Sequence, residues 1–476
     1  MTQGGAKKSD GGGVPHGARL TAELLAKYDR PGPRYTSYPT AVEFHEGFGA
    51  ERYLAKLDEA ARTPGEPLSL YVHLPFCRER CTFCGCNVII TQKPGVADAY
   101  LDDLVREVNL VADRLGGRTR LVQYHWGGGT PTYLTVEQMR RVWDAIAARF
   151  TFDPGAEIAI EVDPRVTTHA QVDLLRELGF NRISMGVQDF DPTVQEAVNR
   201  RQTLEETRDL HRYMRSLGME SINFDFIYGL PHQTPESFRT TIEHALELRP
   251  DRVAVYSYAF VPWIKAHQKA IRLEDLPPRD VKLELFGIAH ELFLGAGYQQ
   301  IGMDHFALKG DSLAVAARER TLFRNFMGYS THPARDYVGL GVSAIGDLGG
   351  AFAQNTKKLN RYHDALDRGL PPIERGFERS KDDEIRRDVI QELMCNFHVD
   401  IGGIERRHGI DFASYFADSL RELDDGPATH GFVRRDARSI DVTPAGQLFV
   451  RNVCMAFDAY LKAKEGAEKP IFSRTV

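Results

Sequence analysis

Four of the six cysteines lie within ten residues of the chain, at Cys77, Cys81, Cys84 and Cys86. Their spacing is C-x3-C-x2-C-x-C, and an aromatic residue, Phe83, precedes the third thiol. Three thiolates on one short loop suit a four-iron cluster held at three corners, whose fourth iron stays open to an external ligand. A structural zinc site more often combines two Cys-x2-Cys pairs that are a dozen or more residues apart. The spacing therefore favours an iron–sulfur cluster, with zinc as the alternative.

The rest of the chain indicates a reducing compartment. The N-terminus is polar and glycine-rich, without a hydrophobic region of the signal-peptide type, and no apolar run approaches the ~20 residues of a membrane helix. We expect a cytoplasmic protein with a disordered tail over residues 1–18. Disulfides are uncommon in the cytosol, so a tight cysteine cluster there more often binds metal. Cys395 and Cys454 stand alone in helical patterns and are interpreted as buried apolar side chains.

Six short runs rich in valine, isoleucine, phenylalanine and tyrosine predict the strands that must position the cysteine loop. They cover residues 68–75, 121–128, 157–164, 182–190, 221–229 and 252–260. Each run indicates a strand that is buried on both faces. Helical stretches separate them: Thr135 and Gln138 have the spacing of a capping box. Gly179, Gly218 and Gly297 lie where helices are expected to end, at positions that favour a left-handed backbone conformation.

Strand–helix alternation of this kind predicts an α/β fold with parallel strands and right-handed crossovers. Six units fit a partial (β/α)6 barrel, and a doubly wound sheet is the alternative. In both folds ligands bind beyond the carboxyl ends of the strands. Unusual residues collect there: the cysteine loop follows the first strand, the sequence GGGTP follows the second, and Glu161, Gln188 and Asp225 lie on the next three.

The 476-residue chain is long enough for two or three domains. We expect four parts after the tail. Residues 19–65 would be an N-terminal segment that reaches toward the active site, and residues 66–305 the barrel. Residues 306–375 would be a glycine-rich segment that completes the site and is loop-like over residues 306–360, and residues 376–476 a small, mainly helical, winged-helix-like domain. Residues 383–462 hold 14 acidic and 10 basic side chains. Because a nucleic-acid-binding module is normally basic, this balance argues against DNA binding. The overall net charge of −6 likewise does not indicate binding to an anionic membrane surface.

The cysteine loop after a first strand, followed by GGGTP after a second, resembles the radical S-adenosylmethionine superfamily. The resemblance implies that Cys77, Cys81 and Cys84 ligate a [4Fe-4S] cluster, and that Cys86 is a neighbour without a ligand role. It also implies that the fourth iron binds the amino and carboxylate groups of S-adenosylmethionine. Glycines let a backbone approach a ligand closely, and a carboxylate such as Glu161 suits a ribose diol.

Longer stretches narrow the resemblance to the oxygen-independent coproporphyrinogen III oxidase (dehydrogenase) family. They are PRYTSYPT, YVHLPFCRERCTFCGCN, HWGGGTPT, IYGLPHQTPESF, IGMDHFA, RNVCMAFDAYL and FSRTV, and the resemblance runs from about residue 20 to 476. It implies an oxidoreductase of haem (porphyrin) biosynthesis. A 5′-deoxyadenosyl radical would convert the ring A and B propionates of coproporphyrinogen III to vinyl groups, giving protoporphyrinogen IX. The expected partners are this tetrapyrrole and an electron donor such as flavodoxin or ferredoxin, with no nucleic acid and no membrane, and the expected state is a monomer.

The family binds two S-adenosylmethionine molecules, and its contact residues carry over where the motifs match. The cluster-bound molecule would contact Tyr71, Gly128, Glu161 and Ile345. The second would contact Gly129, Thr130, Gln188, Arg200, Asp225 and Ala259; Arg201 is the alternative for Arg200. Tyr71 and Ile345 could instead be core side chains. Candidates for substrate contact or catalysis are Tyr71, His73, Arg34 and the tyrosines of PRYTSYP.

Two positions depart from the family pattern. The family commonly has histidine where this chain has Phe260, and glutamine where it has Met327. Each change removes a hydrogen-bonding group near the expected second cofactor or the substrate, an interaction worth roughly 1–3 kcal/mol where it is left unmade. A paralogue with altered tetrapyrrole specificity therefore stays open. So do a haem carrier and a different radical enzyme, such as a methyltransferase or a haem-degrading relative.

Overall fold

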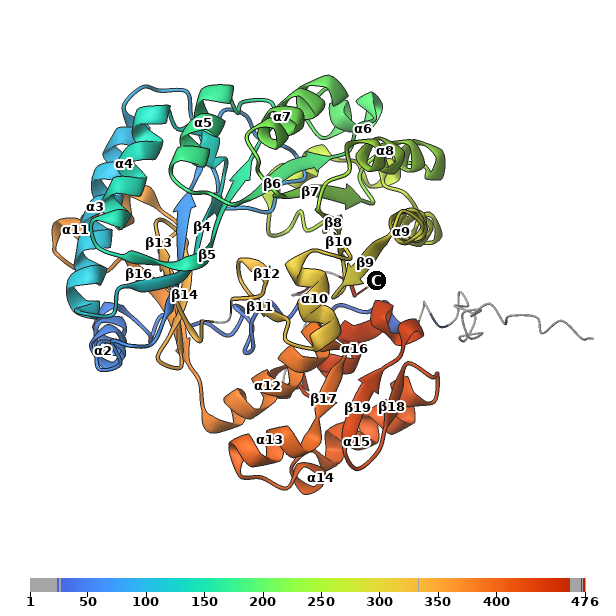
Figure 1. Ribbon diagram of the computed structural model, residues 1–476. Coiled ribbons are helices and arrows are strands. Elements are labelled where there is room, and N and C mark those ends of the chain that lie inside the picture. The colour runs from blue at the N-terminus through green and yellow to red at the C-terminus, as the bar shows by residue number, and fades with distance from the viewer. Residues whose placement is uncertain (1–23, 25–26, 333, 463–471, 473, 476) are drawn as a thin grey trace, which may run out of the picture.

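The computed structural model describes residues 24, 27–332, 334–462, 472 and 474–475. The predicted tail over residues 1–18 lies outside this part of the chain. Six parallel strands, each paired with the next in chain order, form the centre of the molecule (Figure 1). They are β1 (Leu68–Leu74), β4 (Arg120–Gly128), β5 (Thr151–Val162), β6 (Arg182–Gln188), β7 (Ser221–Tyr228) and β8 (Arg252–Ser257). All six lie where the sequence predicted strands, and the partial barrel is confirmed.

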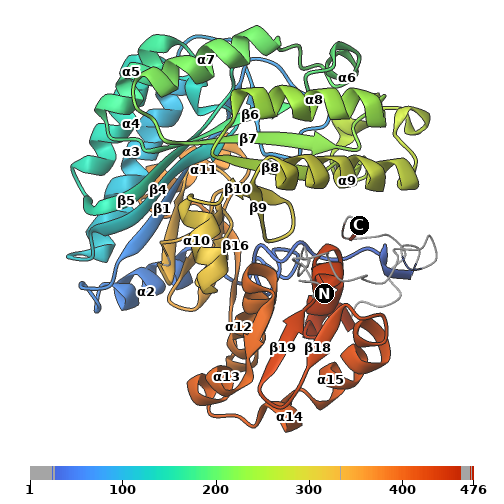
Figure 2. The same ribbon diagram turned by 45° about the vertical axis from the view of Figure 1, so that its right-hand side comes forward.

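Helices cover the outer face of these strands (Figures 1 and 2). They are α3 (Val96–Leu115), α4 (Val136–Ala147), α5 (His169–Glu177), α6 (Pro192–Ala197), α7 (Leu204–Ser216), α8 (Pro235–Leu248) and α9 (Arg279–Gly295). The capping box of α4 is present: the Thr135 hydroxyl accepts from the Gln138 amide, and the Gln138 side chain bonds the Thr135 amide. The predicted end glycines have φ angles of 86°, 73° and 91° at Gly179, Gly218 and Gly297. The helix boundaries thus follow from local sequence.

The sheet continues beyond the six strands on both sides, to twelve strands. β13 (Asp336–Leu340) pairs parallel to β1, and β14 (Ile345–Leu348), β15 (Ala351–Asn355) and β16 (Ile373–Glu378) follow antiparallel. At the other edge, β10 (His305–Leu308) and β9 (Tyr298–Ile301) add to β8. Among the described residues the two edges, β16 and β9, do not pair, so the barrel is open.

The loop-like prediction for residues 306–360 was wrong. Besides β13 to β15, this segment contains α10 (Ser312–Glu319), the hairpin β11 (Phe323–Asn325) and β12 (Gly328–Ser330), and the start of α11 (Leu359–Asp367). The strands are only three to five residues long, so no periodicity develops within them. Glycines at 341, 349 and 350 adopt positive φ at the turns between them. In sequence, short strands with glycine turns resemble a loop.

The C-terminal domain combines helices with a small antiparallel sheet. Its helices are α12 (Lys381–Asn396), α13 (Ile401–His408), α14 (Phe412–Tyr415), α15 (Ala417–Leu423), α16 (Val450–Met455) and α17 (Ala459–Lys462). Its strands pair in the order β17 (His398–Asp400), β19 (Ser439–Val442) and β18 (Val433–Arg435). Cys395 and Cys454 are buried in apolar surroundings, as predicted. No helix of the described residues is long and apolar enough to cross a membrane.

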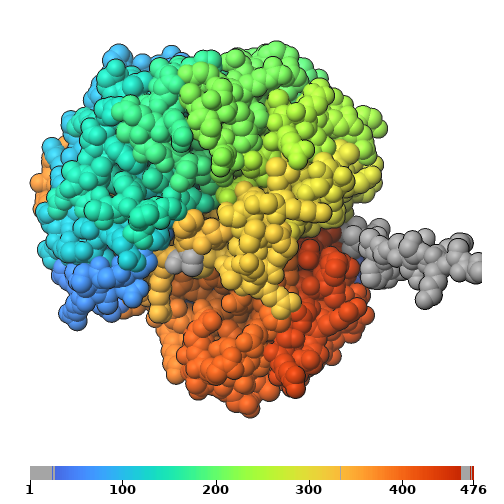
Figure 3. Space-filling model, in the orientation of Figure 1, coloured from blue at the N-terminus to red at the C-terminus, as the bar shows by residue number. Residues whose placement is uncertain are grey.

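The N-terminal leader, residues 27–40, runs between the barrel and the C-terminal domain (Figures 1 and 2). Figure 3 shows that domain, in orange and red, joined to the barrel along one side. On the domain side, the Tyr35 hydroxyl donates to Asp458 at 3.0 Å, and Arg451 donates to the carbonyl oxygens of Gly32 and Pro33. α2 (Ala50–Ala60) follows the leader and contacts α3. The leader therefore connects the two parts of the molecule.

Candidate functional site

A cavity of about 580 Å³ lies at the carboxyl ends of the six parallel strands. Its walls come from the cysteine loop and from the ends of β4 through β8, together with the leader side chain Arg34. Most of the residues singled out in the sequence line it: Cys77, Cys81, Cys84, Gly128, Gly129, Thr130, Glu161, Gln188, Arg200, Asp225 and Ala259. Tyr71, His73 and Ile345 do not. The volume is that of an ordinary small-molecule site.

The cysteine loop is held in shape from both sides by hydrogen bonds to its backbone carbonyl groups. The loop begins at β2 (Phe76–Cys77), which pairs with β3 (Ile89–Ile90). From the segment after β8, His267 Nε2 lies 2.7 Å from the Cys84 oxygen, and Gln268 donates to the Phe83 oxygen at 2.9 Å. From the opposite side, Asn199 donates to the Arg80 oxygen at 3.0 Å. These buttressing side chains carry no motif, so sequence reasoning missed them.

The three candidate ligand thiols have different neighbours. Cys77 Sγ lies 3.4 Å from the Thr130 hydroxyl, and burial raises the pKa of Cys77 to about 11. A hydrogen bond from Cys86 lowers the pKa of Cys84 to about 6. Cys81 is buried and faces two arginine guanidinium groups. Metal coordination deprotonates a thiol outright, so all three side chains can serve as thiolate ligands.

The glycines of HWGGGTP are required by the protein's own packing. A methyl group at Gly127 would lie 2.9 Å from the Glu161 carboxylate, and one at Gly128 would lie 2.6 Å from the His73 ring. At Gly129 it would lie 2.6 Å from the backbone of Pro75. Gly128 also has φ of 116°, a conformation that side chains disfavour. The run therefore seats the end of β4 against β1, the cysteine loop and the end of β5.

Glu161 is held at the floor of the cavity by two donors. The Gly128 amide donates to its Oε2 at 3.2 Å, and His125 Nε2 lies 3.4 Å from its Oε1. Burial alone would raise the pKa of Glu161, but these hydrogen bonds lower it below the ordinary value. Glu161 is therefore an anion near neutral pH, and an ionised carboxylate accepts hydrogen bonds strongly. Such a carboxylate can accept hydrogen bonds from both hydroxyl groups of a diol.

Tyr71 and His73 lie on β1 behind the cavity wall. The Tyr71 hydroxyl is 3.0 Å from His73 Nδ1, and the Tyr71 ring stacks on His125 with centroids 5.8 Å apart. His73 Nε2 lies 3.0 Å from the Asn87 oxygen, and burial lowers the pKa of His73. Ile345 begins β14, where its backbone packs against Gly339 of β13. These three residues are not among those that line the cavity.

The other half of the cavity is polar. Asp225 accepts from the Ser184 hydroxyl at 2.7 Å and from Asn223 at 2.9 Å, and burial raises its pKa. Gln188 ends β6 with φ of 70°. Arg200 lines the cavity with Gln188 and Asp225, and its buried Nε has no hydrogen-bond partner among the described residues. These polar side chains together form a wall that suits a polar ligand.

The structure separates Arg200 from its neighbour. Arg200 is 7% exposed and lines the cavity, whereas Arg201 is exposed and forms an ion pair with Glu196 on the surface. Phe260 packs in an apolar cluster with Phe83 beside the cysteine loop. Met327 lies at the turn of the β11–β12 hairpin, where its amide donates to Asn325 at 2.8 Å. Neither Phe260 nor Met327 lines the cavity.

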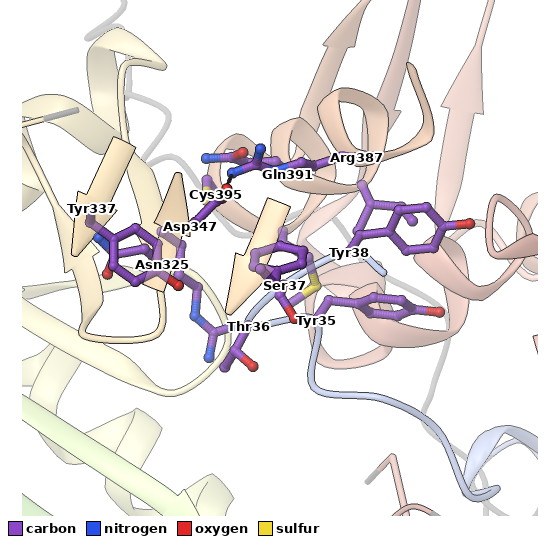
Figure 4. A pocket seen from close by; sticks show the side chains of 14 residues that line it. Tyr35, Thr36, Ser37, Tyr38, Asn325, Tyr337, Asp347, Arg387, Gln391 and Cys395 are labelled. Atoms are coloured by element: carbon purple, nitrogen blue, oxygen red, sulfur yellow. Dashed lines mark hydrogen bonds and ion pairs between the residues drawn. The ribbon is translucent and has the colours of Figure 1, made fainter. Parts of the chain in front are cut away.

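A second, smaller cavity of about 30 Å³ lies where the leader, the hairpin and α12 meet (Figure 4). Tyr35 and Tyr38 come from the leader, and Arg387 of α12 pairs with Asp347 at 2.6 Å. Its lining shares no residue with the larger cavity. The space suffices for one or two water molecules, so we interpret it as a packing junction.

Comparison with known proteins agrees with this geometry. The family model of the Radical SAM superfamily matches residues 71–245, and that of the HemN C-terminal domain matches residues 380–449. Oxygen-independent coproporphyrinogen III oxidase from Pseudomonas aeruginosa is 47% identical, covering 96% of this chain and 99% of the relative. The enzyme of the same name from Escherichia coli is 48% identical, covering 95% and 98%.

A solved structure is similar over the same length. The structure of Escherichia coli coproporphyrinogen III oxidase (HemN), described as a radical SAM enzyme, superimposes with a TM-score of 0.87. The two chains are 47% identical in this alignment, which covers 92% of this chain and 98% of the other. The similarity therefore includes the barrel, the cysteine loop and the C-terminal domain together.

Proposed function

Because the chain belongs to the oxygen-independent coproporphyrinogen III oxidase family of radical SAM enzymes, we propose that it decarboxylates coproporphyrinogen III oxidatively. The ring A and B propionates would become vinyl groups, giving protoporphyrinogen IX in haem biosynthesis. Each conversion removes one hydrogen atom from the propionate side chain, one carbon dioxide and one further electron. The observation that carries the proposal is the convergence of three loop cysteines, the GGGTP turn and Glu161 on one cavity, in a chain similar to these enzymes over its whole length.

The residues present fit an iron–sulfur cluster. Cys77, Cys81 and Cys84 line one cavity on a loop that is fixed by hydrogen bonds from both sides. When bound, a [4Fe-4S] cluster would supply the one-electron reduction that cleaves S-adenosylmethionine. The protein would contribute the shape of the loop, because its buttresses hold the thiols in place before iron arrives.

Two S-adenosylmethionine sites are part of the proposal. At the cluster, Glu161 would accept hydrogen bonds from the ribose of the first molecule, and the backbone of Gly128 would contact the same molecule. Gln188, Arg200 and Asp225 would hold a second molecule, and the polar cavity wall that they form supports this assignment. Tyr71 and Ile345 would be further contacts of the molecule at the cluster. Tyr71 stacks on His125, and His73 packs against Gly128, so both also hold neighbours of Glu161.

Arg34 is our candidate for contact with the substrate. Coproporphyrinogen III carries four propionates, and Arg34 is a cation from the leader that lines the cavity. Asp304 accepts from it at 2.7 Å and orients it. We also propose a cytoplasmic monomer reduced by a flavodoxin or ferredoxin.

The test is anaerobic reconstitution with iron and sulfide, followed by S-adenosylmethionine, a strong reductant and coproporphyrinogen III. Chromatography with mass detection should show protoporphyrinogen IX together with 5′-deoxyadenosine. Cys81→Ser should abolish both products and lower the bound iron, because one cluster corner loses its ligand. Cys395→Ala, a buried cysteine of the C-terminal domain, is the matched control and should keep both.

Each competing function gives a different outcome. Deoxyadenosine without the vinyl product would reject this substrate and favour a paralogue; a methylated or ring-opened tetrapyrrole would identify another radical enzyme. Neither product from a protein with a full cluster, together with stoichiometric haem binding, would favour a carrier. A colourless protein with zinc in place of iron would contradict the cluster.

A further inference from the structure

Two arginine side chains single out Cys81 among the three candidate ligands. Arg165 Nη2 and Arg200 Nη1 each lie 3.8 Å from Cys81 Sγ. The Thr130 hydroxyl lies 3.4 Å from Cys77 Sγ, and Cys84 takes a hydrogen bond from Cys86. Lys265 and Arg80 also act on Cys84 through their charge, but among the described residues Cys81 is the thiol with two guanidinium groups within 4 Å.

A single buried carboxylate fixes both arginines. Asp163 Oδ2 lies 2.6 Å from Arg165 Nη2 and 3.0 Å from Arg200 Nη1, and Arg165 Nε donates to Asp163 Oδ1 at 3.0 Å. Asp163 is 6% exposed. Arg200 is further tied to the Gly186 oxygen. Two cations against one anion leave a net positive charge next to Cys81, held rigidly where solvent screening is weak.

We propose that Asp163 positions Arg165 and Arg200 against Cys81 to set the reduction potential of the cluster. Reduction adds one negative charge, which nearby guanidinium groups stabilise, and hydrogen bonds to cluster sulfurs raise the potential in the same way. Arg165 and Asp163 are therefore positioning residues for electron entry. The inference rests on the proposed cluster but not on the tetrapyrrole.

Arg165 is the residue to test, because Arg200 also lies in the expected second cofactor site. The experiment compares reconstituted wild type with Arg165→Met, Arg165→Gln and Arg165→Lys by redox titration monitored by electron paramagnetic resonance. We expect Arg165→Met to lower the midpoint by at least ~59 mV, a tenfold change in the ratio of reduced to oxidised cluster for one electron. Arg165→Lys should recover part of the shift, and Arg165→Gln less, since it keeps a donor without the charge.

Arg140→Met is the matched control. Arg140 forms an exposed ion pair with Glu177 on the outer face of α4 and should leave the midpoint unchanged. Iron and sulfide content is measured for wild type and for every variant, so that loss of the cluster is distinguished from an unchanged midpoint. Wild type without a cluster would contradict the proposed cofactor and not the role of Arg165. A midpoint equal to wild type, or a more positive one, in cluster-loaded Arg165→Met overturns the inference. So does loss of the cluster from all three Arg165 variants while wild type retains it, because Arg165 would then serve in cluster retention.

Discussion

Gly129 illustrates how closely the end of β4 packs on the loop that carries the cysteines. A methyl group there would meet the backbone of Pro75 and Phe76, which cannot rotate away as a flexible side chain could. At Gly127 and Gly128 the obstacles are the Glu161 carboxylate and the His73 ring. Gly127, Gly128 and Gly129 thus shape the floor of the cavity and let the end of β4 pack closely against β1, β5 and the cysteine loop.

Gly129→Ala should lower the free energy of unfolding of the cluster-free protein by about 1–3 kcal/mol, because the backbone must shift to admit a methyl group. Urea denaturation followed by circular dichroism measures it. Gly287→Ala on α9, where an added methyl group meets nothing within 4 Å, is the control. It should leave stability unchanged or raise it by up to about 1 kcal/mol. Equal stability of Gly129→Ala and wild type would show that the packing is looser than described.

At the scale of elements, Glu107 joins α3 to the segment that follows β13. Its carboxylate accepts from the Gly341 amide at 2.7 Å, from Asn355 at 2.6 Å and from the Tyr362 hydroxyl at 2.5 Å. Burial nevertheless raises its pKa from 4.5 to about 7. The helix α3 is therefore connected to the turn after β13, to β15 and to α11 through an acid whose pKa is near neutral.

This raised pKa predicts that stability falls as the pH rises. Between about pH 4.5 and 7 the folded chain binds the Glu107 proton and the unfolded chain does not, so ionisation disfavours folding. The free energy of unfolding falls by up to about 3 kcal/mol as the pH rises, and this loss is complete above pH 7. Glu107→Gln should remove this part of the slope in urea titrations at pH 5 and pH 8. Asp113→Asn, an exposed position on the same helix, should retain it; an unchanged slope in Glu107→Gln would refute the assignment.

At the scale of the whole molecule, the leader brings the C-terminal domain and the cavity into one unit. Tyr35 and Arg451 fasten it to the domain, while Arg34 reaches Asp304 and the cavity wall. The Arg34 backbone oxygen also accepts from Arg324 of the hairpin at 3.0 Å. A domain that contributes none of the loop cysteines therefore still determines where a cavity side chain lies.

Arg34→Met should lower kcat/KM for coproporphyrinogen III by about 10- to 100-fold, the loss expected for a hydrogen bond to a charged group. Cleavage of S-adenosylmethionine without substrate should persist, because the cysteine loop is untouched. Arg52→Met, a surface change on α2, is the control. Equal losses of both activities in Arg34→Met would mean that the leader acts through the fold and not by contact with substrate.

The sequence determined what depends on local chemistry. Strand positions follow from runs of buried residues, and the α4 capping box follows from Thr135 and Gln138. The spacing of the cysteines favoured a cluster, and the motifs identified the family. These features are readable because each depends on residues close together in the chain.

Only the tertiary structure decided which distant residues meet. It placed Arg200 in the cavity and Arg201 on the surface, and it brought Arg165 and Asp163 to Cys81, some eighty residues earlier in the chain. It also showed that β13, β14 and β15 extend the sheet, because pairing, first of β13 with β1, and not periodicity makes these short segments strands. Contacts of this kind depend on the register of parallel strands and on side-chain packing, which no local pattern encodes.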